Sequence, residues 1–126
     1  MARQTIPREP DLPKSARPNR ESDCAVEVTV ALIGGKWKPI LLFHLLDGPQ
    51  RYSQLQRLVP KASDRMLTRS LRELETDGLV CRTIFAEVPP RVEYDLTPQG
   101  RSLVPILEAM STWGTARTQA CRVASP

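Results

Sequence analysis

The stretch RMLTRSLREL, residues 65–74, interleaves three arginines with three leucines. On a helix each residue turns the chain by about 100°, so Leu67, Leu71 and Leu74 share one arc. The arginines at positions 65, 69 and 72 fall on the opposite arc. The spacing therefore predicts an amphipathic helix whose leucines pack on a core while its basic face points outward. Because such a face is often only solvated, the neighbouring segments decide what it contacts.

The residues before this stretch predict a helix-turn-helix. Ser53, with Gln56 three residues later, has the form of a capping box that opens a short helix ending before Pro60. Ser63 is the expected N-cap of the arginine-bearing helix, and Gly78 is its expected stop. Two helices joined by such a tight turn form a motif that commonly binds DNA.

The residues after the stretch predict a β-hairpin. LVCRTIFAEV (residues 79–88) and VEYDL (residues 92–96) are strand-like runs around a tight loop, and the tip of the hairpin carries Arg91. A hairpin directly after a helix-turn-helix is the winged-helix plan, in which the second helix enters the major groove and the wing touches the backbone or minor groove. With both flanks present, DNA is the predicted partner of the basic face.

The candidate DNA contacts follow from this plan. Arginine's planar fork matches the O6 and N7 acceptors of guanine and also pairs with phosphate. The residues expected to reach base edges lie near the start of the recognition helix, with a possible phosphate contact one turn further on: Arg65, Thr68 and Arg69, then Arg72. Further expected phosphate contacts lie at the entries of the two helices: Arg51, Tyr52, Ser53, Gln54 and Ser63. The two serines could equally serve only as caps.

Further helices are expected on both sides of this motif. CAVEVTVALIGG (residues 24–35) is apolar around most of a helical circumference, so a second subunit could cover part of it. Residues 36–49 predict a core helix that carries Trp37, Ile40, Leu41, Phe43, Leu45 and Leu46. Thr97 and Pro98 open a final helix to about residue 119. Its single apolar stripe comprises Leu103, Ile106, Leu107, Met110 and Trp113.

The composition is that of one small domain with a basic excess. Lysine and arginine number 18 against 14 acidic residues, a formal net charge of +4, and the sequence pI is near 9.3. Such a balance favours nucleic acid or another anionic partner. No apolar run approaches the roughly 20 residues of a membrane span, and the N-terminus lacks the apolar segment of a secretory signal. We expect no membrane association.

Residues 1–21 are expected to form a flexible, slightly basic arm. They hold four prolines and five basic residues against three acidic ones, with almost no apolar material. Such a segment cannot bury enough surface to offset its ordering entropy. It is either a solvated tail or an arm that contacts the DNA backbone. The folded domain is expected over residues 22–120, followed by a C-terminal tail over residues 121–126.

Three stretches together resemble the HxlR family of bacterial winged-helix transcriptional regulators: residues 24–55, residues 63–80 and residues 87–103. The likeness covers roughly residues 24–114. It implies a mainly α (α+β) fold, a winged helix-turn-helix with extra N- and C-terminal dimerisation helices. It also implies a homodimer on a palindromic operator, Trp37 in the core, and Arg91 as the DNA contact of the wing. The expected dimer interface comprises Val26, Val30, Ile33, Leu107, Met110 and Trp113.

The cysteines bear on redox chemistry. Cys24, Cys81 and Cys121 are far apart and form no CxxC pair, so a reducing bacterial cytoplasm is favoured over a disulfide scaffold or a zinc site. In some members of the resembled family a cysteine at the position of Cys24 senses quinones, aldehydes or oxidants. We expect Cys24 in the first turn of its helix, where the dipole favours the thiolate and acidic neighbours oppose it. The alternative is a buried small hydrophobe at the dimer interface. Cys81 is expected in the core, and Cys121 is expected to be incidental.

Nothing in the sequence indicates an enzyme, a metal or a cofactor. His44 stands alone in a hydrophobic helix and is expected to pack in the core, and there is no Gly-rich phosphate loop. The prediction is a sequence-specific DNA-binding transcriptional regulator, a repressor on the resemblance alone, released by a thiol-reactive signal. One alternative is a winged-helix module that binds proteins and not DNA. Another keeps the DNA binding but places a non-covalent small-molecule effector between the dimerisation helices.

Overall fold

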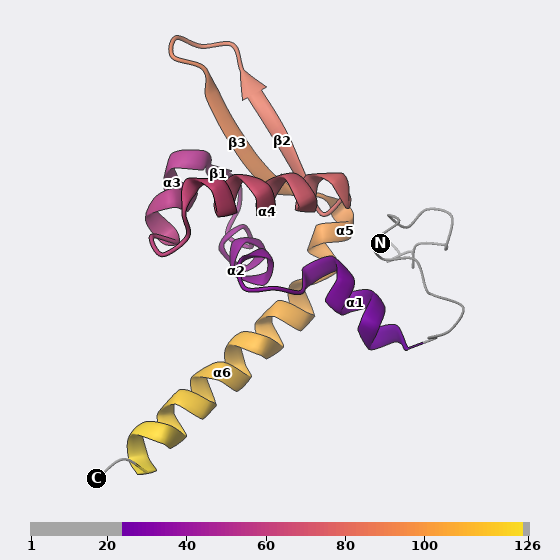
Figure 1. Cartoon of the computed structure of the whole chain (residues 1–126), viewed down its shortest axis with the longest axis vertical. Helices are drawn as coiled ribbons and strands as arrows, with labels where there is room; N and C mark the ends of the chain where they lie inside the picture. Colours follow the sequence, from indigo (N-terminus) through magenta and orange to yellow (C-terminus); the bar gives the residue numbers. More distant parts are fainter. Residues whose placement is uncertain (1–23, 125–126) are drawn as a thin grey trace.

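The computed structural model describes residues 24–124, and side chains within that range up to residue 120. The arm predicted over residues 1–21 lies outside the described residues. The helices are α1 (Ala25–Ile33), α2 (Trp37–His44), α3 (Tyr52–Leu58), α4 (Asp64–Thr76), α5 (Pro98–Arg101) and α6 (Val104–Ala124). The strands are β1 (Gln50–Arg51), β2 (Val80–Phe85) and β3 (Arg91–Leu96). The β2–β3 hairpin and α6 leave the helical body in opposite directions (Figure 1).

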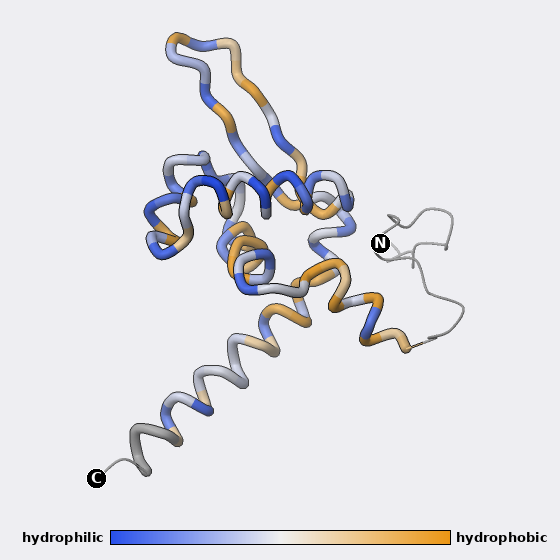
Figure 2. The backbone as a smooth tube through the Cα atoms, viewed as in Figure 1, coloured by the Kyte–Doolittle hydropathy of each residue, from blue (hydrophilic) through white to orange (hydrophobic). Residues whose placement is uncertain are grey.

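Leucines of α2 and α4 are among the most deeply buried side chains of the core. Leu67, Leu71 and Leu74 are each at most 1% exposed, which confirms the apolar arc predicted for residues 65–74. They belong to one cluster with buried side chains of α2, α3 and the sheet. Trp37 is 7% exposed, so its expected place in the core is confirmed. The tube coloured by hydropathy shows α2 as largely apolar and α4 as mainly polar with apolar turns (Figure 2).

The prediction for α2 was wrong at one position, because Leu42 is fully buried and Phe43 is 40% exposed. Helix α2 contacts both α4 and α6, so its buried side spans a wide arc. With about 100° per residue, Leu41, Leu42 and Leu45 fall inside that arc and Phe43 falls outside it. Phe43 lies instead beside the groove between α2 and α6.

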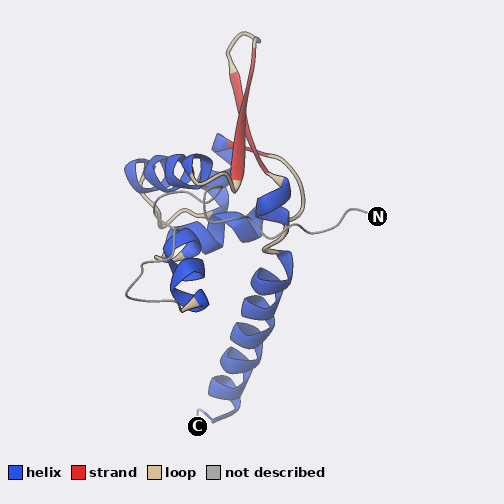
Figure 3. Cartoon of the chain, turned by 90° about the vertical axis from the view of Figure 1, so that its right-hand side faces the viewer, coloured by secondary structure: helices blue, strands red, loops and turns tan. Residues whose placement is uncertain are grey.

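The sheet has three antiparallel strands in the order β1–β3–β2. The sequence predicted the hairpin of β2 and β3, in which Phe85 pairs with Arg91, but missed β1. Strand β1 has only two residues, too few to show an alternating pattern, and pairs with Glu93 and Tyr94 of β3. Cys81 was expected in the core, yet it is exposed. The hairpin projects away from the body (Figure 3), and residues 81–84 of β2 are all exposed.

The C-terminal helix begins as predicted but is interrupted. Thr97 caps α5 by accepting a hydrogen bond from the amide of Gly100 (3.0 Å). Gly100 packs so closely on the strand region that a Cβ would lie 2.1 Å from the carbonyl oxygen of Leu79. The single helix expected from Thr97 breaks after α5 and restarts at Val104. Pro105 explains the break, since it has no N–H to continue the hydrogen bonds of α5.

Helix α6 then continues to Ala124, so residues 121–124 are helical and not the tail that was predicted. None of the helices within residues 24–124 combines the length and the apolar composition that crossing a bilayer needs.

Candidate nucleic-acid interface

The exposed face of α4 is the centre of the candidate site. Its leucines face α2, so Arg65, Thr68, Arg69 and Arg72 all lie on the exposed side. Ser63 caps the helix by accepting a hydrogen bond from the amide of Met66 (3.2 Å), as predicted. The hairpin rises on the side of α4 opposite α2 (Figures 1 and 3). The basic face and the wing therefore point to the same side of the molecule.

One arginine of this face is held by a carboxylate. Arg69 Nε donates to Glu73 Oε1 (3.2 Å), and Glu73 Oε2 lies 2.8 Å from Nζ of Lys38 on α2. The hydrogen bond from Lys38 is the main cause that lowers the pKa of Glu73 below its usual 4.5. The sequence interpretation missed this cluster. The i,i+4 spacing of Arg69 and Glu73 was a usable signal, whereas nothing local pointed to Lys38.

The entry of α3 differs from the prediction. The N-cap is Arg51 and not Ser53, and Gln54 Oε1 accepts a hydrogen bond from the Arg51 amide (2.8 Å). The helix thus begins two residues earlier than expected, and Gln54 makes the hydrogen bond from the N3 side chain to the N-cap amide that a capping box contains. The second hydrogen bond of a capping box is missing, because the guanidinium of Arg51 has no acceptor for the N3 amide. Ser53 lies inside the first turn and is exposed, and Arg51 is exposed as well.

Two hydrogen bonds join α3 to α4. The hydroxyls of Tyr52 and Thr68 lie 3.2 Å apart. Gln56 Nε2 donates to Asp64 Oδ1 (2.6 Å). The bonds hold one side chain near each end of α3 against α4, so they fix the angle of the helix-turn-helix. Tyr52 and Thr68 are therefore part of the frame of the site as well as candidate contacts.

Arg91 lies at the first residue of β3 and is engaged within the wing. Its guanidinium lies 4.0 Å from the centre of the Phe85 ring. Its Nη2 is 3.2 Å from Glu87 and its Nε is 3.1 Å from Glu93, and its side chain is 26% exposed. The tip itself is apolar, since Val88 is fully exposed beside Pro89 and Pro90. Arg91 was expected to be an unpaired cation at the tip, but its guanidinium is already paired with Glu87 and Glu93.

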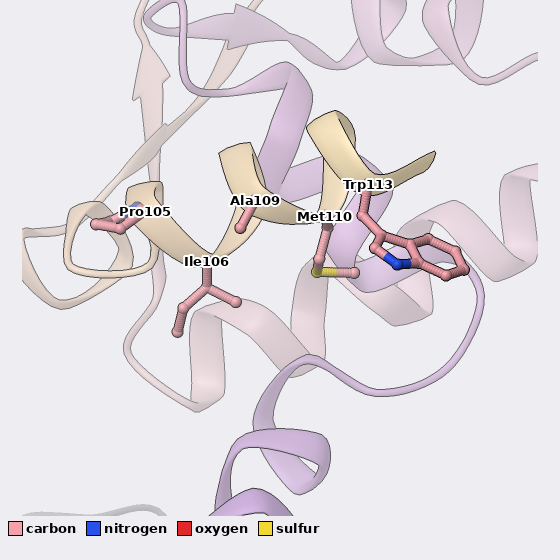
Figure 4. A pocket seen from close by; sticks show the side chains of 5 residues that line it. All are labelled: Pro105, Ile106, Ala109, Met110 and Trp113. Atoms are coloured by element: carbon pink, nitrogen blue, oxygen red, sulfur yellow. The ribbon is translucent and has the colours of Figure 1, made fainter. Parts of the chain in front are cut away.

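The residues expected at a dimer interface divide into two groups. Ile33 and Leu107 are buried within the single chain, at 7% and 2% exposure, so they have little surface left for a partner. This corrects the expectation for those two positions, because the core of the protomer already covers them. The exposed members lie on α1 and α6: Val26, Val30, Met110 and Trp113. On α6, Met110 and Trp113 line an apolar hollow with Pro105, Ile106 and Ala109 (Figure 4).

The described thiols are both accessible. Cys24 is exposed and stands at the N-cap of α1, one position before the first turn where it was expected. Cys81 is also exposed and unbonded. The side chain of Cys121 lies outside the described residues. Within the described range, no three His, Cys, Asp or Glu side chains lie close enough to hold a metal ion. His44 is half-buried, and its ring meets the Phe43 ring edge to face with 6.2 Å between their centres.

Comparison with known proteins identifies the fold and its general role. The model of the HxlR-like helix-turn-helix family matches residues 32–121. The chain belongs to this family. It is similar to the HTH-type transcriptional regulator YybR of Bacillus subtilis, at 50% identity over 101 residues and 80% of each chain. It is 56% identical to an HTH-type transcriptional regulator of Methanothermobacter thermautotrophicus over 91 residues, 72% of this chain and 70% of the relative.

Solved structures of similar regulators agree with the fold described above. The redox regulator HypR in its oxidised form is 50% identical, with a TM-score of 0.72 over 74% of this chain and 96% of that one. Diamide-treated YodB of B. subtilis is 32% identical, with a TM-score of 0.61 over 71% of this chain and 89% of that one. This HxlR-family chain is therefore a DNA-binding transcriptional regulator of the winged helix-turn-helix type, like the HTH-type transcriptional regulators to which it is similar.

Proposed function

We propose that this chain is a homodimeric repressor that reads a palindromic operator with α4. The observation that carries the proposal is the division of α4 into a buried leucine side and an exposed side with three arginines. A basic helix face beside a projecting wing suits an anionic duplex, because arginine pairs with both phosphate and guanine. The sign of regulation, repression, rests on the family resemblance.

The kind of DNA contact proposed for each residue depends on its position on the helices. Arg65, Thr68 and Arg69, on the exposed side of the first half of α4, read base edges. Arg72 reaches phosphate one turn further on. Phosphate contacts at the helix entries are proposed for Arg51, Tyr52, Ser53, Gln54 and Ser63. For Arg91 a DNA contact requires its guanidinium to exchange Glu87 or Glu93 for a phosphate, because both carboxylates hold it in the free chain.

The homodimer is proposed from the apolar surface on α1 and α6. Trp113 is 71% exposed, Val26 is 67% exposed and Val30 is 58% exposed, values that are unusual for large apolar side chains unless a partner covers them. For each α4 to read one half-site, the two-fold axis of this dimer must place the two α4 helices about 34 Å apart, one turn of DNA.

The direct test is selection of duplexes by the full chain from a random-sequence library, followed by mobility shift of the selected duplex. A selected palindrome bound far more tightly than a scrambled duplex supports the proposal. Binding of both at equal strength, or of neither, would favour the other candidate class, a winged-helix module for protein partners. Repression itself is tested with a reporter gene that carries the selected site in its promoter.

A thiol signal is the proposed means of release. The chain is similar to the redox regulator HypR, and both described thiols, Cys24 and Cys81, are exposed. Diamide should release the wild-type protein from the selected duplex, and Cys24→Ser should bind normally but resist release. If Cys81→Ser resists instead, the sensor is the wing cysteine. If the variant that combines Cys24→Ser with Cys81→Ser is still released, the sensor is the remaining thiol, Cys121. If diamide does not release even the wild type, the thiol proposal fails, and the alternative is a non-covalent effector between the dimerisation helices.

A further inference from the structure

A cluster of three charges joins the core to the exposed face of α4. Glu73 Oε2 lies 2.8 Å from Nζ of Lys38 on α2, and Glu73 Oε1 accepts from Nε of Arg69 at 3.2 Å. Each carboxylate oxygen therefore has its own cation. Lys38 and Arg69 differ sharply in exposure, since the Lys38 side chain is 15% exposed and the Arg69 side chain is 81% exposed. The carboxylate thus stands between an inner and an outer cation.

The inner cation preserves the charge that α4 offers to DNA. A carboxylate paired with Arg69 alone would cancel much of its positive potential toward an incoming phosphate or base. Lys38 offsets that negative charge, so the cluster as a whole keeps one net positive charge. The lowered pKa of Glu73 means that the carboxylate is ionised at neutral pH and that the pairing persists there.

The same contact restricts the direction of the Arg69 side chain. Its Nε is used by Glu73, and within the described residues its terminal amino groups donate no hydrogen bond to another side chain. A free arginine on an exposed helix samples many rotamers, and that freedom is lost on binding DNA. An arginine whose Nε is already hydrogen-bonded to a neighbouring side chain loses less conformational entropy on binding. Its two terminal amino groups remain available for the O6 and N7 acceptors of a guanine.

We propose that Glu73, braced by Lys38, is a positioning residue that determines base specificity by presenting Arg69 to the operator. The inference rests on the proposed function, in which Arg69 reads a base edge. It assigns to α2 a part in base reading, although α2 lies on the side of α4 away from the exposed arginines. It predicts that removing the carboxylate harms discrimination between sequences more than it harms affinity for DNA in general.

The test compares Glu73→Gln with the matched control Glu75→Gln. Glu75 lies on the same helix with similar exposure, but it pairs with Arg82 of β2 (3.6 Å) and not with Arg69. Dissociation constants are measured for the duplex selected by the wild-type protein and for a scrambled duplex of equal length. We expect Glu73→Gln to lower the ratio of specific to scrambled affinity roughly five- to tenfold. The control, which removes the same charge from α4, should keep the ratio of the wild type.

A double-mutant cycle separates the brace from the contact itself. Arg69→Ala should lower the ratio, and Glu73→Gln in the Arg69→Ala background should lower it no further. If Arg69→Ala lowers the ratio and Glu73→Gln does not, the positioning role is overturned while the proposed function stands. If Arg69→Ala leaves the ratio unchanged, the proposed base contact fails and this inference fails with it. If Glu73→Gln is unfolded at the assay temperature, Glu73→Asp, which keeps the charge but shortens the reach to Arg69, replaces it with the same expected loss.

Discussion

In the proposed function Arg69 reads a base edge of the operator. Its Nε donates to Glu73, and its side chain is 81% exposed. We expect Arg69→Ala to weaken binding to the selected duplex by about 1–3 kcal/mol and to relax preference at one base position per half-site. Mobility shifts on duplexes changed at single positions measure this. Equal losses on every duplex would move Arg69 from base reading to phosphate contact.

Arg91 makes a different contribution because it is paired within the wing. If it exchanges a carboxylate for a phosphate on binding, Arg91→Ala weakens all duplexes alike and lowers the slope of log affinity against log salt by about 0.9. Glu87→Gln, which frees one side of the guanidinium, should strengthen binding to all duplexes. Titrations at several salt concentrations provide both measurements. An unchanged slope for Arg91→Ala would show that Arg91 only braces the wing against Phe85.

At the scale of elements, α4 is secured by its leucines and by its charged link to α2. Leu71 is 1% exposed, so Leu71→Ala should destabilise the fold by about 2–5 kcal/mol. Met66 on the same helix is 48% exposed, and Met66→Ala should cost less than about 1 kcal/mol. Urea unfolding of the two variants checks the difference. Equal losses would mean that the leucine side of α4 does not carry the packing.

The link between α2 and α4 should also be visible in acid. The pKa of Glu73 is lowered in the folded state, first by the hydrogen bond from Lys38, from an ordinary value of 4.5. Its contribution to stability is therefore complete above about pH 4.5 and is lost as the pH falls through the lower folded-state pKa. Glu73→Gln should lose less stability than the wild type between neutral pH and that acid range. Urea midpoints across the range test this, and parallel curves for the two proteins would contradict it.

Elements with a strong local signal were predictable, and those set by distant contacts were not. The leucine spacing of residues 65–74, the Ser63 cap and the hairpin are all read within one window of sequence. Strand β1 exists only because β3 lies beside it. The Lys38–Glu73 pair joins residues 35 positions apart, and the burial of Leu42 in place of Phe43 depends on which helices cover α2. In each of these cases tertiary packing decides what local pattern leaves open.

At the scale of the whole molecule, the wing and α6 extend in opposite directions (Figure 3), so the proposed DNA-reading surface and the proposed dimer surface lie apart. The exposed apolar side chains of α6 are distant in sequence from the arginines of α4. Operator affinity should nevertheless depend on both groups of side chains. In the proposed dimer each α4 reads one half-site, so a monomer would lose the contacts of the second half-site and the gain from linking the two. The apolar hollow around Met110 and Trp113 is the surface that such a dimer would cover.

Met110→Glu tests this dependence, because it places a charge in the apolar hollow without touching α4. We expect a monomer in sedimentation and an affinity for the selected palindrome reduced at least tenfold, with a single half-site bound as weakly as by the wild type. Thr115→Glu, an exposed position further along α6 that does not line the hollow, is the control and should remain dimeric. A Met110→Glu protein that stays dimeric would move the interface away from this face of α6. A monomer that binds the palindrome as tightly as the wild type would show that the two α4 helices do not read the operator together.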